Sequence, residues 1–187
     1  MCKGKAVDVL IICLLILFII SNFVFYPAEV EGQSMENTFH DGDSIVVCRL
    51  LKPKAGDIVI AESKSLKEDL IKRVIAVGTD SIEINGSKVK VNNKVISEDY
   101  IKEPFDSFVS KTVIPKGSYW LMGDNRNHSS DSRMFGSFSK HDIDGVVIAN
   151  LTDHGITYDT YKLVRFGVQL ILFIILLRRE QRGREDV

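Results

Sequence analysis

The sequence predicts a mainly β protein, an antiparallel and barrel-like sheet domain anchored by one membrane helix at each end. Two observations predict this fold class. Long apolar runs lie near both ends of the 187-residue chain, and short β-branched runs alternate with turn residues between them. The middle region has the length of one domain. The expected parts are a cytoplasmic start with a transmembrane helix over 1–26, an extracytoplasmic β domain over 27–161, a second transmembrane helix over 162–178 and a basic cytoplasmic tail over 179–187.

The first apolar run, VLIICLLILFIISNFVF over residues 9–25, approaches the roughly 20 residues that an α-helix needs to cross a bilayer. The alternative is a cleaved secretory signal, because Lys3 and Lys5 supply a positive start. Such a signal has a shorter apolar core that ends at small residues, whereas this run ends in Phe-Tyr-Pro at 25–27. An uncleaved anchor is therefore the preferred interpretation.

The second apolar run, LVRFGVQLILFIILL over residues 163–177, is shorter and contains Arg165 and Gln169. The alternative is an amphipathic helix in the membrane interface, but the run shows no sustained charged face, which favours insertion. Lysines precede the first run and arginines follow the second, and such residues stay on the cytoplasmic side. Both chain ends are then predicted inside the cell, with the β domain on the extracytoplasmic face of the cell membrane.

The middle of the chain has the strand and turn spacing of an all-β fold. Asn85-Gly86 predicts a tight hairpin turn, and Asn92-Asn93 offers a second one. Cys48 lies in an apolar run and is interpreted as a small buried side chain. The predicted strands cover residues 44–48, 57–61, 69–77, 81–84, 88–91, 119–122 and 145–150.

The charge balance argues against a nucleic-acid partner. The chain has 24 Lys and Arg residues against 25 Asp and Glu residues, a net charge of -1, so it lacks the basic field that nucleic acids require. Two of the three cysteines lie at or inside the first apolar run, so the β domain has no disulfide framework. The sequence assigns no oligomeric state.

Two segments hold a candidate nucleophile and a candidate base. Residues 32–38, GQSMENT, follow the first apolar run, and Ser34 in such a loop is either a nucleophile or an ordinary turn former or helix cap. Residues 70–77, LIKRVIAV, place two adjacent cations in an apolar strand. If Lys72 is buried, its pKa falls and its neutral amine can take a proton from a serine hydroxyl. Arg73 stays protonated and suits a structural ion pair.

A third segment, residues 123–133 with the sequence GDNRNHSSDSR, crowds polar and charged groups after a predicted strand. A solvated loop is the plain alternative. Four of its residues, however, offer internal ion pairs that fix the shape of a loop, and its hydroxyls are able to orient a lysine amine. The ion-pairing residues are Asp124, Arg126, Asp131 and Arg133.

Taken together and in this order, the segments resemble the type I signal peptidases, membrane-bound Ser-Lys proteases that remove signal peptides from exported preproteins. Ser34-Met35 resembles the nucleophile box of the family, and Ile-Lys-Arg-Val at 71–74 resembles its lysine box. Residues 42–46 and 56–59 resemble its two strand boxes, and the run from 123 to 133 with Gly136 resembles its last box. The match covers most of the chain.

The resemblance implies a serine endopeptidase in which Ser34 is the nucleophile and Lys72 the general base, with no metal and no cofactor. It also implies that the backbone N–H of Ser34 forms part of the oxyanion hole. The other residues that it assigns are Ser129, which orients the Lys72 amine, Asp131 and Arg133, which form a supporting ion pair, and Met35, which lines the substrate site.

The implied partners are preprotein substrates and membrane lipid. The resemblance implies shallow pockets that select small residues, typically alanine, at the first and third positions before the cut. The peptide is expected to bind in extended form against a strand edge.

Two positions depart from the family pattern. Asn37 stands where the nucleophile box usually has proline, and Gly32 stands where some members carry a serine whose hydroxyl completes the oxyanion hole. A second membrane crossing is also not general in the family. The alternative function is a non-catalytic, membrane-anchored module that keeps the fold and assists surface or pilus assembly; the presence of both Ser34 and Lys72 counts against it. A self-cleaving repressor-type Ser-Lys protease would carry DNA-binding regions in place of membrane helices.

Overall fold

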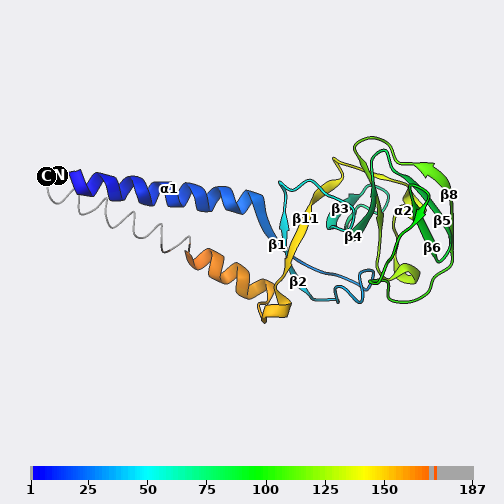
Figure 1. Ribbon diagram of the computed structural model, residues 1–187. Coiled ribbons are helices and arrows are strands. Elements are labelled where there is room, and N and C mark those ends of the chain that lie inside the picture. The colour runs from blue at the N-terminus through cyan, green and yellow to red at the C-terminus, as the bar shows by residue number, and fades with distance from the viewer. Residues whose placement is uncertain (1, 169–170, 172–187) are drawn as a thin grey trace.

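The computed structural model describes residues 2–168 and 171, and their strands form two antiparallel sheets (Figure 1). A seven-stranded sheet has the order β1-β2-β11-β3-β4-β9-β10, and a four-stranded sheet has the order β7-β6-β5-β8. The strands are β1 (Phe25–Glu29), β2 (Ser44–Cys48), β3 (Ile58–Ser63), β4 (Glu68–Val77), β5 (Ser81–Gly86), β6 (Lys88–Val91), β7 (Lys94–Val95), β8 (Ser107–Val113), β9 (Ser118–Met122), β10 (Phe138–Ser139) and β11 (Ile143–Asn150).

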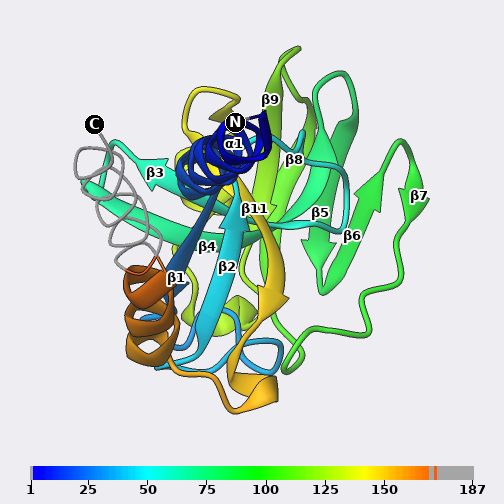
Figure 2. The same ribbon diagram turned by 90° about the vertical axis from the view of Figure 1, so that its left-hand side faces the viewer.

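The prediction of a mainly antiparallel β domain is confirmed, but the expected barrel-like closure does not form among the described strands. Each sheet is open, because β1 and β10 end the larger one and β7 and β8 end the smaller one. After β4 the chain leaves the larger sheet, turns at residues 78–80 and enters the four-stranded sheet with β5 (Figure 2). Two sheets packed on a shared core therefore replace the single closed sheet.

All seven predicted strands exist, with bounds that differ by at most two residues at either end. The strands that we did not predict, β1, β7, β8 and β10, all lie at the edge of a sheet. An edge strand pairs on one side only and needs no continuous apolar pattern. Pro27 within β1 illustrates this, because a residue without an N–H is tolerated mainly at an edge.

Both predicted hairpin turns are confirmed. Asn85 pairs with Lys88 across the turn that joins β5 to β6, and Gly86 has a φ of 61°. Asn92 and Asn93 have φ values of 51° and 66° and join β6 to β7. These are the left-handed conformations that Asn and Gly adopt most readily in tight turns. Cys48 is 4% exposed, as predicted.

Within the described part of the chain, three apolar clusters form the core. One joins β4 and β9 to the four-stranded sheet and includes Ile84 and Trp120. A second lies among β3, β4, β9, β10 and β11 and includes Val59, Val74 and Leu121. The third packs residues of the segment after β1 against β2, β3 and β4. This third cluster fixes the predicted nucleophile segment on the sheet.

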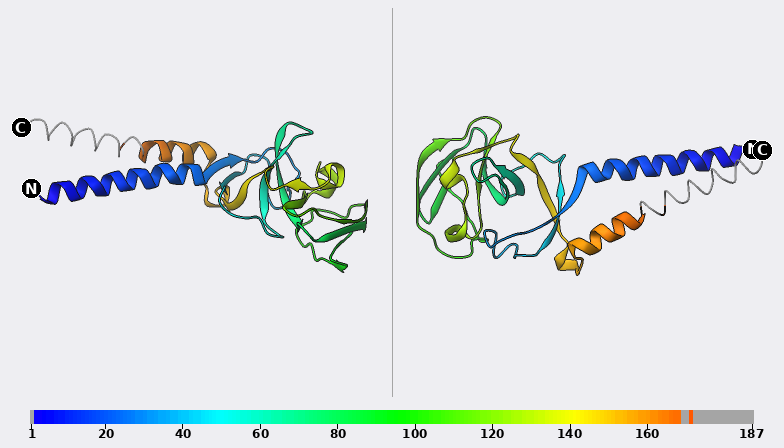
Figure 3. Two further views of the ribbon diagram at one scale, coloured as in Figure 1. Left: turned by 90° about the horizontal axis from the view of Figure 1, so that it is seen from above. Right: turned by 180° about the vertical axis from the view of Figure 1, so that it is seen from behind.

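Helix α1 (Cys2–Val24) and a helical segment over residues 158–168 leave the β body on the same side (Figure 3). Arg165 joins them by donating to the backbone carbonyl of Asn22 at 3.2 Å and to its side-chain oxygen. Among the described residues, no helix combines the length and apolar character that a membrane crossing requires. The two membrane crossings therefore stay predictions, and residues 172–187, with the predicted tail, lie outside the described part of the chain.

Candidate active site

Strand β4 places Lys72 in the interior of the protein. The strand pairs with β3 on one side and β9 on the other, and Lys72 lies opposite Val59. Its side chain is therefore shielded from water, and the residue is only 3% exposed. A lysine in such a position is unusual, because burial disfavours its charged form.

The buried amine is held on the serine that we predicted as the nucleophile. Lys72 Nζ donates to Ser34 Oγ at 2.8 Å and to the backbone carbonyl of Ile71 at 2.8 Å. Desolvation lowers the pKa of Lys72 to about 8, against the opposing charges of Asp131, Glu68 and Asp124. A substantial fraction of the amine is therefore neutral at mildly alkaline pH and able to accept a proton.

The polar turn after β9 packs directly on the backbone of the nucleophile segment. The N–H of Asn125 donates to the carbonyl of Ser34 at 3.0 Å, and its side-chain amide donates to the carbonyl of Gln33 at 3.0 Å. A Cβ atom at Gly123 would lie 2.5 Å from the Ser34 carbonyl oxygen and 2.3 Å from Ser129 Oγ. Only glycine allows this approach without a rearrangement, which explains the residue at this position.

Asp131 and Arg133 lie together in this turn as a two-point ion pair. Arg133 Nε donates to Asp131 Oδ1 at 2.8 Å, and its Nη2 donates to Oδ2 at 2.9 Å. The same carboxylate accepts from the N–H of Gly123 and from the hydroxyl of Ser129 at 2.8 Å. Among the described residues, Ser129 makes no hydrogen bond to Lys72. Its predicted role in orienting the amine therefore stays a prediction.

The remaining predicted ion-pairing residues reach outside the turn. Arg73 forms a two-point pair with the fully buried Asp124, at 2.8 Å from Nε and 2.6 Å from Nη2. Asp124 also accepts from the Thr38 hydroxyl, so the pair ties β4 and the turn to the nucleophile segment. Arg126 pairs with Glu98 at 2.5 Å. The expectation of purely internal pairs is thus wrong for Asp124 and Arg126, because buried charges find partners in space and not along the chain.

Sequence reasoning missed three residues of this network. Thr38 lies in the quoted nucleophile segment and Asn125 in the quoted polar turn, so their positions were visible but their contacts were not. Tyr100, whose ring lies 4.0 Å from the Arg73 guanidinium, gave no signal in the sequence.

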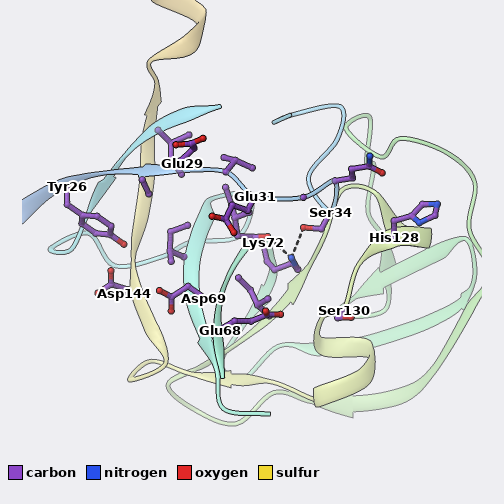
Figure 4. A pocket seen from close by; sticks show the side chains of 18 of the residues that line it. Tyr26, Glu29, Glu31, Ser34, Glu68, Asp69, Lys72, His128, Ser130 and Asp144 are labelled. Atoms are coloured by element: carbon purple, nitrogen blue, oxygen red, sulfur yellow. Dashed lines mark hydrogen bonds between the residues drawn. The ribbon is translucent and has the colours of Figure 1, made fainter. Parts of the chain in front are cut away.

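A cavity of about 680 Å³ opens beside the serine and lysine (Figure 4). Ser34 and Lys72 point toward one another, and the labelled side chain of His128 lies on the far side of Ser34 from Lys72. Apolar residues form part of the wall, and they are Ala28, Val30, Ile45, Ile60, Leu70 and Ile71. The wall of the cavity that Ser34 lines therefore includes apolar surface.

Met35, predicted to line the substrate site, is fully buried and does not line this cavity. It packs in the third apolar cluster against residues that do line it, such as Ile45 and Ile60. Among the described residues, no group of three or more His, Cys, Asp or Glu side chains gathers as a metal site.

The family match and the named relatives indicate a serine endopeptidase, and the serine hydroxyl bonded to a buried lysine amine beside the cavity is its candidate site. Residues 4–151 match the family described as signal peptidase, peptidase S26, and the chain belongs to this family.

Three relatives illustrate the similarity. The chain is 35% identical over 162 residues to Signal peptidase I P of Bacillus subtilis subsp. natto, a match that covers 77% of this chain and 88% of that protein. It is 32% identical over 158 residues to Signal peptidase IB of Staphylococcus aureus (strain Mu50 / ATCC 700699), covering 73% and 82%. A crystal structure of a signal peptidase I from Enterococcus faecalis V583 is 25% identical, with a TM-score of 0.45, and covers 52% of this chain and 98% of that one.

Proposed function

We propose that the protein removes signal peptides from exported preproteins, with Ser34 as the nucleophile and Lys72 as the general base. The observation that carries the proposal is the 2.8 Å hydrogen bond from the buried Lys72 amine to Ser34 Oγ at the edge of the cavity. The substrate class follows from the relatives, which are named as signal peptidases I. A non-catalytic module is not favoured, because the buried Lys72 amine bonds to a serine hydroxyl at a cavity, which is the arrangement of a nucleophile and its base.

The reaction proceeds in two stages. Neutral Lys72 takes the hydroxyl proton of Ser34 while Oγ bonds to the scissile carbonyl carbon, and the resulting ammonium then protonates the departing amine as the C–N bond breaks. Lys72 next takes a proton from water as the water oxygen bonds to the acyl carbon, and the ammonium then returns a proton to Ser34 Oγ as the ester C–O bond breaks and the carboxyl product leaves. The backbone N–H of Ser34 stabilises the oxyanion in both stages.

The ion pair of Asp131 and Arg133 supports this chemistry by holding Ser129 beside the site. The Ser129 hydroxyl donates its hydrogen to Asp131, which leaves its oxygen lone pairs free to accept from the Lys72 amine. Met35 contributes to the substrate site by packing in one cluster with Ile45 and Ile60, which line the cavity.

The substrate peptide lies extended along the cavity, with small side chains such as alanine at the first and third positions before the cut. The apolar wall residues support this choice, because they line the same cavity as Ser34 and small uncharged side chains are able to pack on them. The protein works at the extracytoplasmic face of the membrane, anchored by its terminal segments. The departure of α1 and the 158–168 helix from one side of the β body supports this arrangement (Figure 3).

The test is cleavage of a preprotein with an Ala-x-Ala site by the full chain purified in detergent. Ser34→Ala and Lys72→Ala are each expected to lower kcat by about 10³-fold or more, because nucleophile and base act as a unit. Lys64→Ala, which removes an exposed lysine, is the matched control and retains the parent rate. Cleavage by Lys72→Ala at the rate of the parent would sink the mechanism.

The pH dependence provides a second readout of the same proposal. Below its pKa of about 8, Lys72 is protonated and unable to accept the Ser34 proton. The value of kcat/KM should therefore rise with pH up to about 8 and level off above it. A profile that is flat from pH 6 to pH 9 would exclude Lys72 as the base.

A further inference from the structure

The side chain of Asn125 binds the peptide group between Gln33 and Ser34. Asn125 Nδ2 donates to the Gln33 carbonyl at 3.0 Å, and the Asn125 backbone N–H donates to the Ser34 carbonyl at 3.0 Å. Asn125 is fully buried. These contacts link the nucleophile segment to the turn after β9 across 92 residues of sequence.

The orientation of the Asn125 amide is determined by this contact. Turning the amide round would place Oδ1 against the Gln33 carbonyl, and two acceptors would then face each other. In the actual orientation Oδ1 is buried without a partner among the described residues. A buried acceptor without a partner lowers the stability of the folded state. We therefore look for the role of the Asn125 side chain in the geometry of the site.

The contact also fixes the direction of the Ser34 N–H. In a trans peptide group the C=O and the N–H point in opposite directions. Because the Gln33 carbonyl points at Asn125, the N–H of Ser34 points away from it. Gln33 and Ser34 line the cavity and Asn125 does not, so the N–H is directed toward the cavity side. Within the described part of the chain, this N–H donates to no other group.

We propose that Asn125 is a positioning residue that aims the Ser34 N–H at the carbonyl oxygen of the scissile bond. The inference rests on the proposed role of Ser34 as the nucleophile. Gly32 offers no hydroxyl as a second oxyanion donor, so the direction of the backbone donor carries a larger share of the stabilisation. Asn125 itself touches neither the substrate nor the reacting atoms.

The first measurement separates kcat from KM in Asn125→Ala. Loss of the clamp should lower kcat by about 10- to 100-fold and leave KM within about twofold, since the donor acts mainly in the transition state. The rise of kcat/KM up to pH 8 should stay in place, because the contacts of Lys72 are untouched. Asn127→Ala is the control, since this neighbour is exposed and its side chain bonds to Glu103 and Pro104, away from Ser34; it should behave as the parent.

The second measurement uses a peptide aldehyde and the corresponding peptide alcohol, both ending in Ala-x-Ala. With the aldehyde, Ser34 Oγ bonds to the carbonyl carbon, the C=O π bond opens, and the serine proton passes to Lys72; the alcohol only binds. The ratio of the two affinities therefore reports oxyanion stabilisation and is unaffected by an inactive fraction of protein.

Asn125→Ala should lower this aldehyde-to-alcohol ratio by about tenfold or more. A ratio within twofold of the parent would overturn the positioning role. If Asn125→Ala does not fold, as judged by the fluorescence of Trp120, the near-isosteric Asn125→Asp, which lacks the amide donor, gives the same test. Failure of the parent to cleave the preprotein would instead refute the proposed function, so the two failures are distinct.

Discussion

The site region and the four-stranded sheet bury different kinds of residue. Around β4 and the turn after β9, the interior holds charged side chains such as Lys72, Asp124 and Asp131, each 3% exposed or less. In the four-stranded sheet, the buried residues described are Ile82, Ile84 and Val89, and the ion pair of Lys90 with Glu83 lies near the surface. We infer that the buried charges of the first region fix the geometry of the site but lower the stability of the fold. The apolar residues buried in the second region stabilise the fold.

The largest effect on stability is expected from breaking the Arg73–Asp124 pair. Arg73→Met leaves Asp124 buried without its cation and should lower the free energy of unfolding by about 3–5 kcal/mol. It should also lower kcat, because Asp124 holds Thr38 of the nucleophile segment. The measurement is urea unfolding in detergent, followed by the fluorescence of the single tryptophan, Trp120.

The matched control for Arg73→Met is Lys90→Met in the four-stranded sheet. The Lys90 and Glu83 side chains are 36% and 32% exposed, and a pair of this kind contributes about 0–1 kcal/mol. Equal losses of stability in the two variants would contradict the distinction between the regions.

A smaller loss of stability, without a loss of catalysis, is expected from Ile84→Ala. Ile84 is completely buried between the sheets, and removing its side chain should lower the free energy of unfolding by about 2–4 kcal/mol. The value of kcat for folded protein should stay within about twofold of the parent, because no site residue lies in this sheet. A fall in kcat comparable to that of Arg73→Met would show that the sheet also shapes the site.

The same contrast explains which strands could be predicted. Strands in the interior of a sheet are buried on at least one face, so their apolar pattern shows in the sequence, as it does for β2 and β9. Strand β8 has little burial and is defined by its pairing with β5, a contact between distant segments. Its seven residues therefore show no apolar pattern from which a strand could be predicted.

The site could be predicted only in part for a related reason. Ser34 and Lys72 were found because each stands out against its local sequence, and their order along the chain resembles a known family. Asn125 could not be given a role, because its hydrogen-bond partner, the Gln33 carbonyl, lies 92 residues away in the sequence. Contacts between polar groups of distant segments depend on the packing of the fold, which local patterns do not encode.

The smallest effect, and the one of opposite sign, is expected from Lys72→Met. The folded protein holds this amine at a pKa of about 8, below the value of about 10.4 in an unfolded chain, so burial of the charged form destabilises the parent at neutral pH. Methionine removes that penalty but leaves the carbonyl of Ile71 and the hydroxyl of Ser34 without their donor. The net gain should be about 1–2 kcal/mol at pH 7, in a protein that no longer cleaves.

The pH dependence of this gain fixes its cause. Between about pH 8 and pH 10.4 the folded parent loses its proton before the unfolded chain does, so the parent becomes more stable as pH rises. The advantage of Lys72→Met should therefore be largest below pH 8 and shrink above it, in urea unfolding of both proteins across this range. If the stability advantage of Lys72→Met stays constant to pH 10, packing and not the buried charge distinguishes the two side chains. The stability of the site region would then depend on apolar packing, as that of the four-stranded sheet does.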